Sequence, residues 1–327
     1  MPEIDWRLGL EIELLAPPGK SRLDLAEAIA EAQRGSVRRF FHPQSEPSLV
    51  PGTPTFHNLT LGFEVLDAEQ NWIAKCVDDL TLQNDLVRNT PPQPGWYRVI
   101  SDDERLLSLI ERQADAQCPL SEVLEPIGRL FGTSPTPGPG GMIRVNDLRG
   151  ASVAIAAPLP GERERPCELI TAPIHDHHQE KLERLLGLAR GLGFTAPLEG
   201  AIHLHFDATA LQSADAIANL IQLLSDQGDR LKQLMGTNPH CRRLGPWPST
   251  LLETISQPQF RQLSWEEARA QLKQLELTKY CDFNLVNCIH NVPNQNTIEV
   301  RILPVWLETR PILEAAATFL ALLKQAL

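Results

Sequence analysis

Apolar and polar residues alternate along several short stretches of the chain, which predicts β-strands with one buried face. In 200–207 three apolar residues alternate with three polar ones, namely Ile202, Leu204 and Phe206 with His203, His205 and Asp207. Successive side chains of a strand point to opposite faces, so both imidazoles and the carboxylate share one face. For this stretch alone, a metal or phosphate site and a solvated strand face are equally good interpretations.

Three further stretches place charged residues at the same period of two. They are 6–14 with Glu11 and Glu13, 167–174 with Glu168, and 297–304 with Glu299 and Arg301. Two carboxylates on one face repel each other unless a cation lies between them, and a carboxylate in an apolar strand is costly to bury unpaired. If these strands meet in one antiparallel sheet, their acids and a histidine form a donor set suited to Mg²⁺ or Mn²⁺.

Helical periodicity and capping residues separate these strands and predict a mixed α+β protein. Ser101 and Ser264 each precede an acidic residue by three positions, the pattern of a capping box. The stretches 59–66 and 72–82 predict a hairpin, and 279–287 resembles a strand. In contrast, 35–62 is expected to be irregular. The Pro/Gly run 133–141 lacks the spacing of the common nucleotide-binding loops and is expected to be a loop.

Composition narrows the class of protein. The chain of 327 residues is 42% hydrophobic and 22% charged, typical of a folded globular protein. Its net charge of -11 argues against a general nucleic-acid binder. No apolar run approaches the ~20 residues of a membrane-spanning helix, and no signal peptide is visible. Six cysteines without a C-x-x-C pair are expected to be reduced thiols in a cytoplasmic protein.

The motifs taken together resemble those of the amidoligase family, within the carboxylate–amine ligase superfamily that includes glutamine synthetase and glutamate–cysteine ligase. The matching elements occur in family order: Gly9-x-Glu11-x-Glu13, Asp79-x-Thr81, Glu168-Leu-Ile-Thr-x-Pro173, Gly200-x-x-His203-x-His205, the Asn-Leu stretch at Asn284, and Thr297-Ile-Glu299-x-Arg301. The resemblance implies a single catalytic domain over 1–327, with a curved, largely antiparallel sheet and helices on its outer face, as in glutamine synthetase.

The resemblance also implies a set of site residues. Glu13 and Glu168 would ligate one metal, with Asp79 or its neighbour Asp78. A second metal on the nucleotide side would be ligated by Glu11, His203 and Glu299. His205 would contact an ATP phosphate, and Arg301 the transferring phosphoryl group or the substrate. Arg242 and Arg243, in the Pro-rich stretch 237–250, are further candidates for phosphate contact.

The chemistry implied is an ATP- and Mg²⁺-dependent ligation of a small-molecule or peptide carboxylate to an amine through an acyl phosphate. Glu13, Glu299 and Arg301 would be the catalytic residues, and metals and Arg301 would offset the charge crowded at the phosphates. An acyl phosphate hydrolyses in water, so the segments 35–58 and 132–141 are candidates for a lid. The substrates and the oligomeric state stay open.

Other functions fit parts of the pattern. A His-x-His pair also occurs in zinc-dependent amidohydrolases, although there it normally lies near the N-terminus. A phosphagen-kinase-like phosphotransferase would carry its site residues on a similar sheet and would need a pocket for a guanidine group. A non-catalytic metal- or nucleotide-binding protein would result if the acidic residues faced solvent.

Overall fold

The computed structural model describes residues 4–47, 55–101, 103–292 and 295–327. The chain folds as two compact units. Unit 1 comprises Met1–Glu13, Thr171–Gly191 and Ala196–Leu327, and unit 2 comprises Leu14–Ile170 and Leu192–Thr195. The chain passes between the units within strands β1 (Leu8–Leu15) and β9 (Pro166–Thr171), and again on either side of the short segment Leu192–Thr195. That both units act as one catalytic domain stays a prediction.

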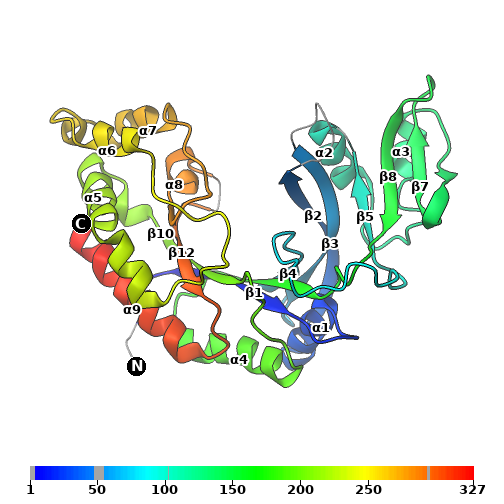
Figure 1. Ribbon diagram of the computed structural model, residues 1–327, viewed down its shortest axis with the longest axis horizontal. Helices are drawn as coiled ribbons and strands as arrows, with labels where there is room; N and C mark the ends of the chain where they lie inside the picture. Colours follow the sequence, from blue (N-terminus) through cyan, green and yellow to red (C-terminus); the bar gives the residue numbers. More distant parts are fainter. Residues whose placement is uncertain (1–3, 48–54, 102, 293–294) are drawn as a thin grey trace. The chain divides into compact units, whose positions relative to one another are not determined.

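In unit 1 the antiparallel strand order is β11-β12-β10-β1 (Figure 1). These strands are β11 (Phe283–Asn284), β12 (Thr297–Pro304) and β10 (Ala201–Asp207) beside β1. Their apolar positions are fully buried, and examples on each long strand are Ile12, Leu204 and Ile302. This burial explains why the alternating sequence pattern identified these strands, since one face must be removed from water.

Helices of unit 1 pack on one another and on this sheet. The two long helices α5 (Ala214–Met235) and α9 (Thr309–Ala326) lie side by side, and α4 (His178–Gly191) contacts α9 (Figure 1). Ser213 caps α5 by accepting a hydrogen bond from Ala216 N–H. The shorter elements are α6 (Ser249–Ile255), α7 (Trp265–Lys273), α8 (Val286–His290), and the 3₁₀ turns Thr209–Leu211 and Phe260–Gln262.

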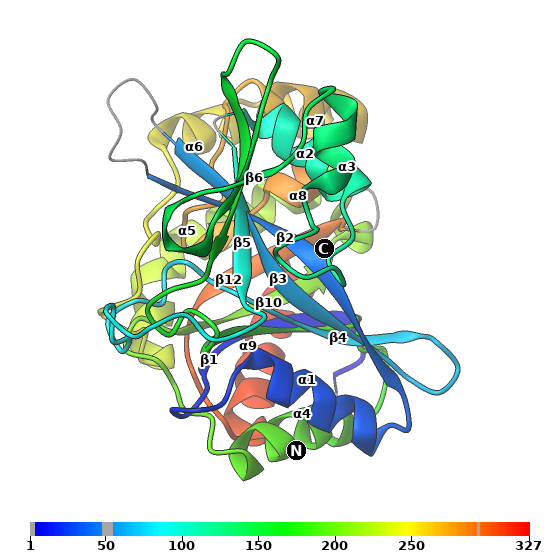
Figure 2. The same ribbon diagram turned by 90° about the vertical axis from the view of Figure 1, so that its right-hand side faces the viewer.

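Unit 2 is built on a second run of strands, in the order β9-β4-β3-β5-β8-β7-β6, with β2 also paired to β3. The pairs from β4 to β6 and the β2–β3 pair are antiparallel, and Figure 2 labels β2, β3 and β5 among these strands. The strands are β2 (Ser36–Pro47), β3 (Thr55–Leu66), β4 (Trp72–Val77), β5 (Tyr97–Ile100), β6 (Thr136–Pro137), β7 (Ile143–Asn146) and β8 (Ser152–Pro158). Helix α1 (Arg22–Ala32) packs on β3 and β4. The remaining elements are α2 (Glu104–Gln113), α3 (Glu125–Leu130) and the 3₁₀ turn Pro139–Gly141.

Three local expectations are wrong. The stretch 35–62 is not irregular, because β2 and β3 form a long antiparallel hairpin there. Strand β2 pairs only with β3 among the described strands, so its polar side chains remain partly exposed and its sequence alternation is weak. Ser101 does not cap α2; its hydroxyl donates to Val153 O, and Asp103 caps the helix instead. The strand-like stretch 279–287 contributes only β11 before α8 begins at Val286.

The predicted fold class is confirmed as an α+β protein with extensive antiparallel strand pairing and packed helices. The finer likeness to glutamine synthetase stays a prediction. Residues 48–54 of the predicted lid lie outside the described residues. No helix in the described part of the chain is long and apolar enough to cross a membrane.

Candidate functional site

Three neighbouring strands of unit 1 bring four of the predicted site residues to one place. The β1–β10 register sets Glu11 opposite His203, and the β10–β12 register sets His205 opposite Glu299. A register irregularity between Ile202 and Leu204 lets β12 carry an extra residue there. The period-two pattern on separate strands thus becomes one cluster of side chains.

Within this cluster, each histidine faces two carboxylates. Nδ1 of His203 lies 2.9 Å from Glu11 Oε2 and 3.3 Å from Glu299 Oε1. Nε2 of His205 lies 3.1 Å from Glu11 Oε1 and 4.0 Å from Glu299 Oε1. The side chain of Glu299 is 5% exposed and that of Glu11 25% exposed, so the cluster is accessible mainly through Glu11.

Polar neighbours hold these carboxylates in place. Asn284 Nδ2 donates to Glu299 Oε2 at 2.6 Å, and Arg301 Nη1 donates to Glu299 Oε1 at 2.5 Å. Oε2 of Glu13 accepts a hydrogen bond of 2.8 Å from the Ala201 backbone N–H. Its Oε1 lies 3.8 Å from His203 Nε2. Such outer contacts fix the direction in which a carboxylate presents its oxygens.

Electrostatics keep the carboxylates ionised despite their burial. Burial alone raises the pKa of Glu11, but the charges of His205 and His203 outweigh it and hold that pKa well below its usual value. The pKa of Glu299 is lowered for the same reason, again against burial. Burial lowers the pKa of the His205 imidazole, whereas Glu11 and Glu299 raise it, and the net direction is upward. His203 and His205 therefore offset the negative charge of the Glu11 and Glu299 carboxylates.

The donor set fits a hard divalent cation. Ligand atoms of Glu11, His205 and Glu299 all lie within 4.8 Å of one another. Although Nε2 of His205 is buried and close to Glu11, it forms no hydrogen bond with the described residues. Two carboxylates and an imidazole with an unused nitrogen are a ligand set that Mg²⁺ or Mn²⁺ accepts.

The structure gives less direct support to four other predicted site residues, which are Arg242, Arg243, Asp79 and Glu168. The Arg243 guanidinium stacks over the Tyr280 ring at 4.8 Å, and Arg242 is exposed. Asp79 and Glu168 belong to unit 2, where Asp79 accepts hydrogen bonds from the N–H and hydroxyl of Thr81. These four roles stay predictions.

Asp78 is distinguished from Asp79 by burial. Its carboxylate is buried and ion-paired with Arg163, whereas that of Asp79 is half-buried in its own turn. A role for either in metal binding stays a prediction.

Asn284 was part of a sequence motif but had no assigned role. Its contact with Glu299 depends on the β11–β12 register, in which the two residues are directly opposite. A two-residue strand leaves no alternation to detect, so the sequence offered no signal for this pairing.

Comparison with known proteins places this arrangement in a family. The family model described as "Putative amidoligase enzyme" matches residues 4–323. No curated protein and no solved structure matches the chain. Because the family match covers nearly the whole chain, the protein belongs to the amidoligase family, named for enzymes that form amide bonds.

Proposed function

We propose that the protein is an ATP- and Mg²⁺-dependent carboxylate–amine ligase that forms an amide through an acyl phosphate. The observation that carries the proposal is the cluster of Glu11, His205 and Glu299 with Arg301 beside it, in a chain of the amidoligase family. Buried carboxylates that stay ionised next to an arginine suit a reaction whose main demand is to offset charge.

Glu11, His205 and Glu299 would hold the nucleotide-side cation. The family resemblance assigned His203 to this position and His205 to a phosphate. We propose His205 as the ligand instead, because its ligand atom lies within 4.8 Å of those of both Glu11 and Glu299. Nδ1 of His203 faces both Glu11 and Glu299, so His203 would orient the two carboxylates. When bound, the cation would neutralise phosphate charge and polarise the transferring group.

Arg301 would act on the nucleotide. Its side chain is 12% exposed, and Nη1 is engaged by Glu299. Nε is buried and has no hydrogen-bond partner among the described residues, so one donor of the guanidinium is unused. We assign this donor to an oxygen of the γ-phosphoryl group, because guanidinium groups bind phosphate oxygens strongly.

The reaction has two steps. An oxygen of the substrate carboxylate attacks the γ-phosphorus, the bond to the β-phosphate bridging oxygen breaks, and ADP leaves. The nitrogen of a neutral amine then attacks the acyl carbon, the acyl–phosphate bond breaks, one amine proton passes to the departing phosphate, and hydrogen phosphate and the amide are released. Arg301 offsets charge in the first step, when anionic carboxylate and phosphate oxygens approach each other.

Hydroxylamine provides a test that does not require the natural amine. Purified full-length protein is incubated with ATP, Mg²⁺, hydroxylamine and pools of amino acids and short peptides as carboxylates. The products expected are ADP and a hydroxamate in equal amounts, detected by mass spectrometry. Glu299→Gln should lose both products, whereas Glu314→Gln, on the exposed surface of α9, should retain them.

Two results would contradict the ligase. ADP release that requires no carboxylate and no amine acceptor would indicate an ATPase or a phosphotransferase. Metal-dependent hydrolysis of amides without ATP would indicate the hydrolase alternative.

A further inference from the structure

Thr297 begins β12 two residues before Glu299, so the two side chains share one face of the strand. In the β10–β12 register Thr297 is opposite Asp207, and Glu299 is opposite His205. Thr297 is therefore the diagonal neighbour of His205 on that face, within reach of a long side chain. Its Oγ1 lies 3.2 Å from Nδ1 of His205. The hydroxyl thus meets the ring nitrogen that does not face the carboxylates of the cluster.

The position of this hydroxyl is fixed by the backbone around it. The N–H of Thr297 donates to Gln295 O at 2.8 Å, in the turn that leads into β12. On the opposite strand, Oδ1 of Asp207 accepts from the N–H and the hydroxyl of Thr209 at 2.8 Å and 2.5 Å. The nearest carboxylate across the strands is thereby engaged with its own turn, and the Thr297 hydroxyl is directed at His205.

The proton of the Thr297 hydroxyl has an acceptor of its own. Oγ1 makes a long contact of 3.5 Å with Gln295 O, a carbonyl oxygen that can only accept. When the hydroxyl donates there, its oxygen presents lone pairs to His205. In a neutral imidazole one nitrogen donates and the other accepts, so Nδ1 then carries the proton and donates to Thr297. The other nitrogen, Nε2, consequently keeps its lone pair.

His203 and His205 share a face of β10 but present different nitrogens to Glu11. His203 directs Nδ1 at Oε2 over 2.9 Å with hydrogen-bond geometry. His205 directs Nε2 at Oε1 over 3.1 Å, yet this nitrogen forms no hydrogen bond with the described residues. A nitrogen lone pair and a carboxylate oxygen at this distance repel each other unless a cation lies between them. The arrangement at His205 is therefore that of two ligands of one cation.

We propose that Thr297 is a positioning residue, which holds the proton of His205 on Nδ1 and so directs the Nε2 lone pair at the nucleotide-side cation. The inference rests on the cation site of the proposed function, formed by Glu11, His205 and Glu299. A histidine that binds a metal almost always donates its other ring N–H to an oxygen, and this contact fixes the tautomer and the ring orientation. Thr297 supplies that oxygen from the same strand that carries Glu299.

Two substitutions separate this role from a purely structural one. Thr297→Val keeps the branched shape but lacks the hydroxyl, whereas Thr297→Ser keeps the hydroxyl but loses a methyl group. Mn²⁺ affinity is measured by electron paramagnetic resonance on the full-length protein without ATP or substrates. Thr297→Val should weaken it about 10–100-fold, and Thr297→Ser should bind nearly as tightly as the parent. A structural role predicts the reverse order, because valine suits a strand better than serine.

Thr318→Val is the matched control. Its hydroxyl donates to Glu314 O within α9, so its removal should leave Mn²⁺ affinity unchanged. Thermal unfolding curves establish that each variant is folded.

Nitrogen-15 NMR of the protein with saturating Mg²⁺ reads the tautomer directly. Nδ1 of His205 should be the protonated nitrogen and Nε2 the unprotonated one, in the parent and in Thr297→Ser. Thr297→Val should lose this preference. The signals are assigned by their disappearance in His205→Gln.

Three results overturn the inference: Mn²⁺ binding by Thr297→Val as tight as in the parent, equal impairment of Thr297→Ser and Thr297→Val, or a proton on Nε2 of His205 with Mg²⁺ present. A parent protein that binds no Mn²⁺ overturns it as well, because the cation site is then absent. Mn²⁺ binding that depends on Thr297, in a protein that forms no hydroxamate from ATP, supports the inference and contradicts the ligase alone. Failure of this role and failure of the proposed activity are therefore distinguishable.

Discussion

The side-chain amide of Asn284 donates to Oε2 of Glu299 over 2.6 Å, so only Oε1 of that carboxylate faces Arg301 and the two histidines. Removing this donor leaves a buried carboxylate oxygen unpaired and lets the carboxylate rotate. Asn284→Ala should therefore weaken Mn²⁺ binding about 10–100-fold, the range typical of lost outer contacts. Electron paramagnetic resonance of free Mn²⁺ measures the affinity, and Gln222→Ala, at an exposed position of α5, is the control. An unchanged affinity would show that this hydrogen bond does not orient Glu299.

Glu13→Gln and Glu299→Gln should each abolish ATP-dependent amide formation while leaving the protein folded. Both substitutions keep the shape of the side chain but remove a negative charge expected to serve a metal. The Glu13 variant can still accept the hydrogen bond from Ala201 N–H through its amide oxygen. Rates of ADP release and circular dichroism spectra check the two halves of this prediction. Near-normal turnover by either variant would make its assigned role wrong.

Gly200→Ala should destabilise unit 1. A Cβ at this position would lie 2.7 Å from Pro197 Cγ and 2.8 Å from Val305 Cγ2, closer than side-chain atoms normally approach. Relieving this overlap by moving the backbone typically costs about 1–3 kcal/mol. Urea unfolding measures the loss of free energy.

Gly191→Ala is a matched control for that substitution. Gly191 ends α4, and nothing lies within 4 Å of its Cβ position, so this variant should be at least as stable as the parent. Equal stability of the two variants would show that Gly200 is not needed for close packing.

Buried cysteines should react with alkylating reagents far more slowly than half-exposed Cys241. Burial raises the pKa of Cys281 to about 11 and that of Cys288 to about 12. A raised pKa leaves little reactive thiolate at pH 8, so labelling should rise only as the pH approaches these values or when the protein unfolds. Peptide mass spectrometry after iodoacetamide treatment at pH 7, 8 and 9 checks this. Rapid native labelling of Cys288 at pH 8 would contradict its burial.

The sequence was informative where burial imposes a strict period. Along β10, fully buried Ile202, Leu204 and Phe206 make the alternation visible, and it correctly placed His203 and His205 on one face. Strand β2 was missed because, among the described strands, it pairs with β3 alone. Its other edge is not covered by a strand, so polar residues such as Arg38 are tolerated along it.

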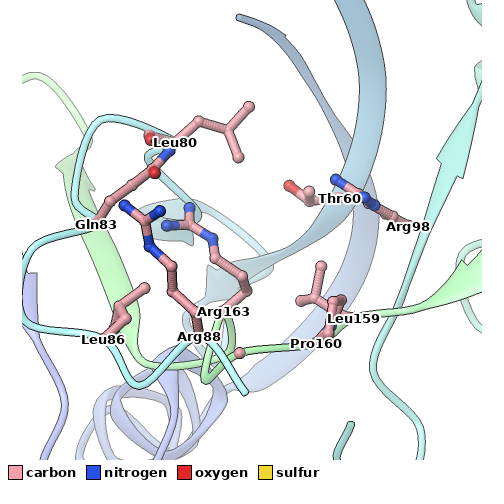
Figure 3. Close-up of a pocket in the computed structure, with 10 residues that line it drawn as sticks. Thr60, Leu80, Gln83, Leu86, Arg88, Arg98, Leu159, Pro160 and Arg163 are labelled. Atoms are coloured by element: carbon pink, nitrogen blue, oxygen red, sulfur yellow. Dashed lines mark hydrogen bonds between the residues drawn. The ribbon is translucent and has the colours of Figure 1, made fainter. Parts of the chain in front are cut away.

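Contacts across strands lie beyond such patterns. The extra residue of β12 changes which side chains of that strand lie beside His203. No periodicity in the sequence of β12 predicts this irregularity. Arg88, Arg98 and Arg163 lie on three different segments yet line one cavity of about 200 Å³ (Figure 3), which no spacing in the sequence could indicate. The metal, nucleotide and substrate roles of the site residues stay predictions.

The bond between Glu11 and His203 joins residues 192 positions apart in the chain, and Glu299 lies still further along. The carboxylate cluster therefore cannot assemble on a ribosome until β12 (Thr297–Pro304) has emerged. Closing loops of this length is slow, because the chain loses conformational entropy before the contacts that stabilise the closed loop have formed. Chains cut short before β12 lack Glu299 and Arg301 and should therefore not form the proposed cation site.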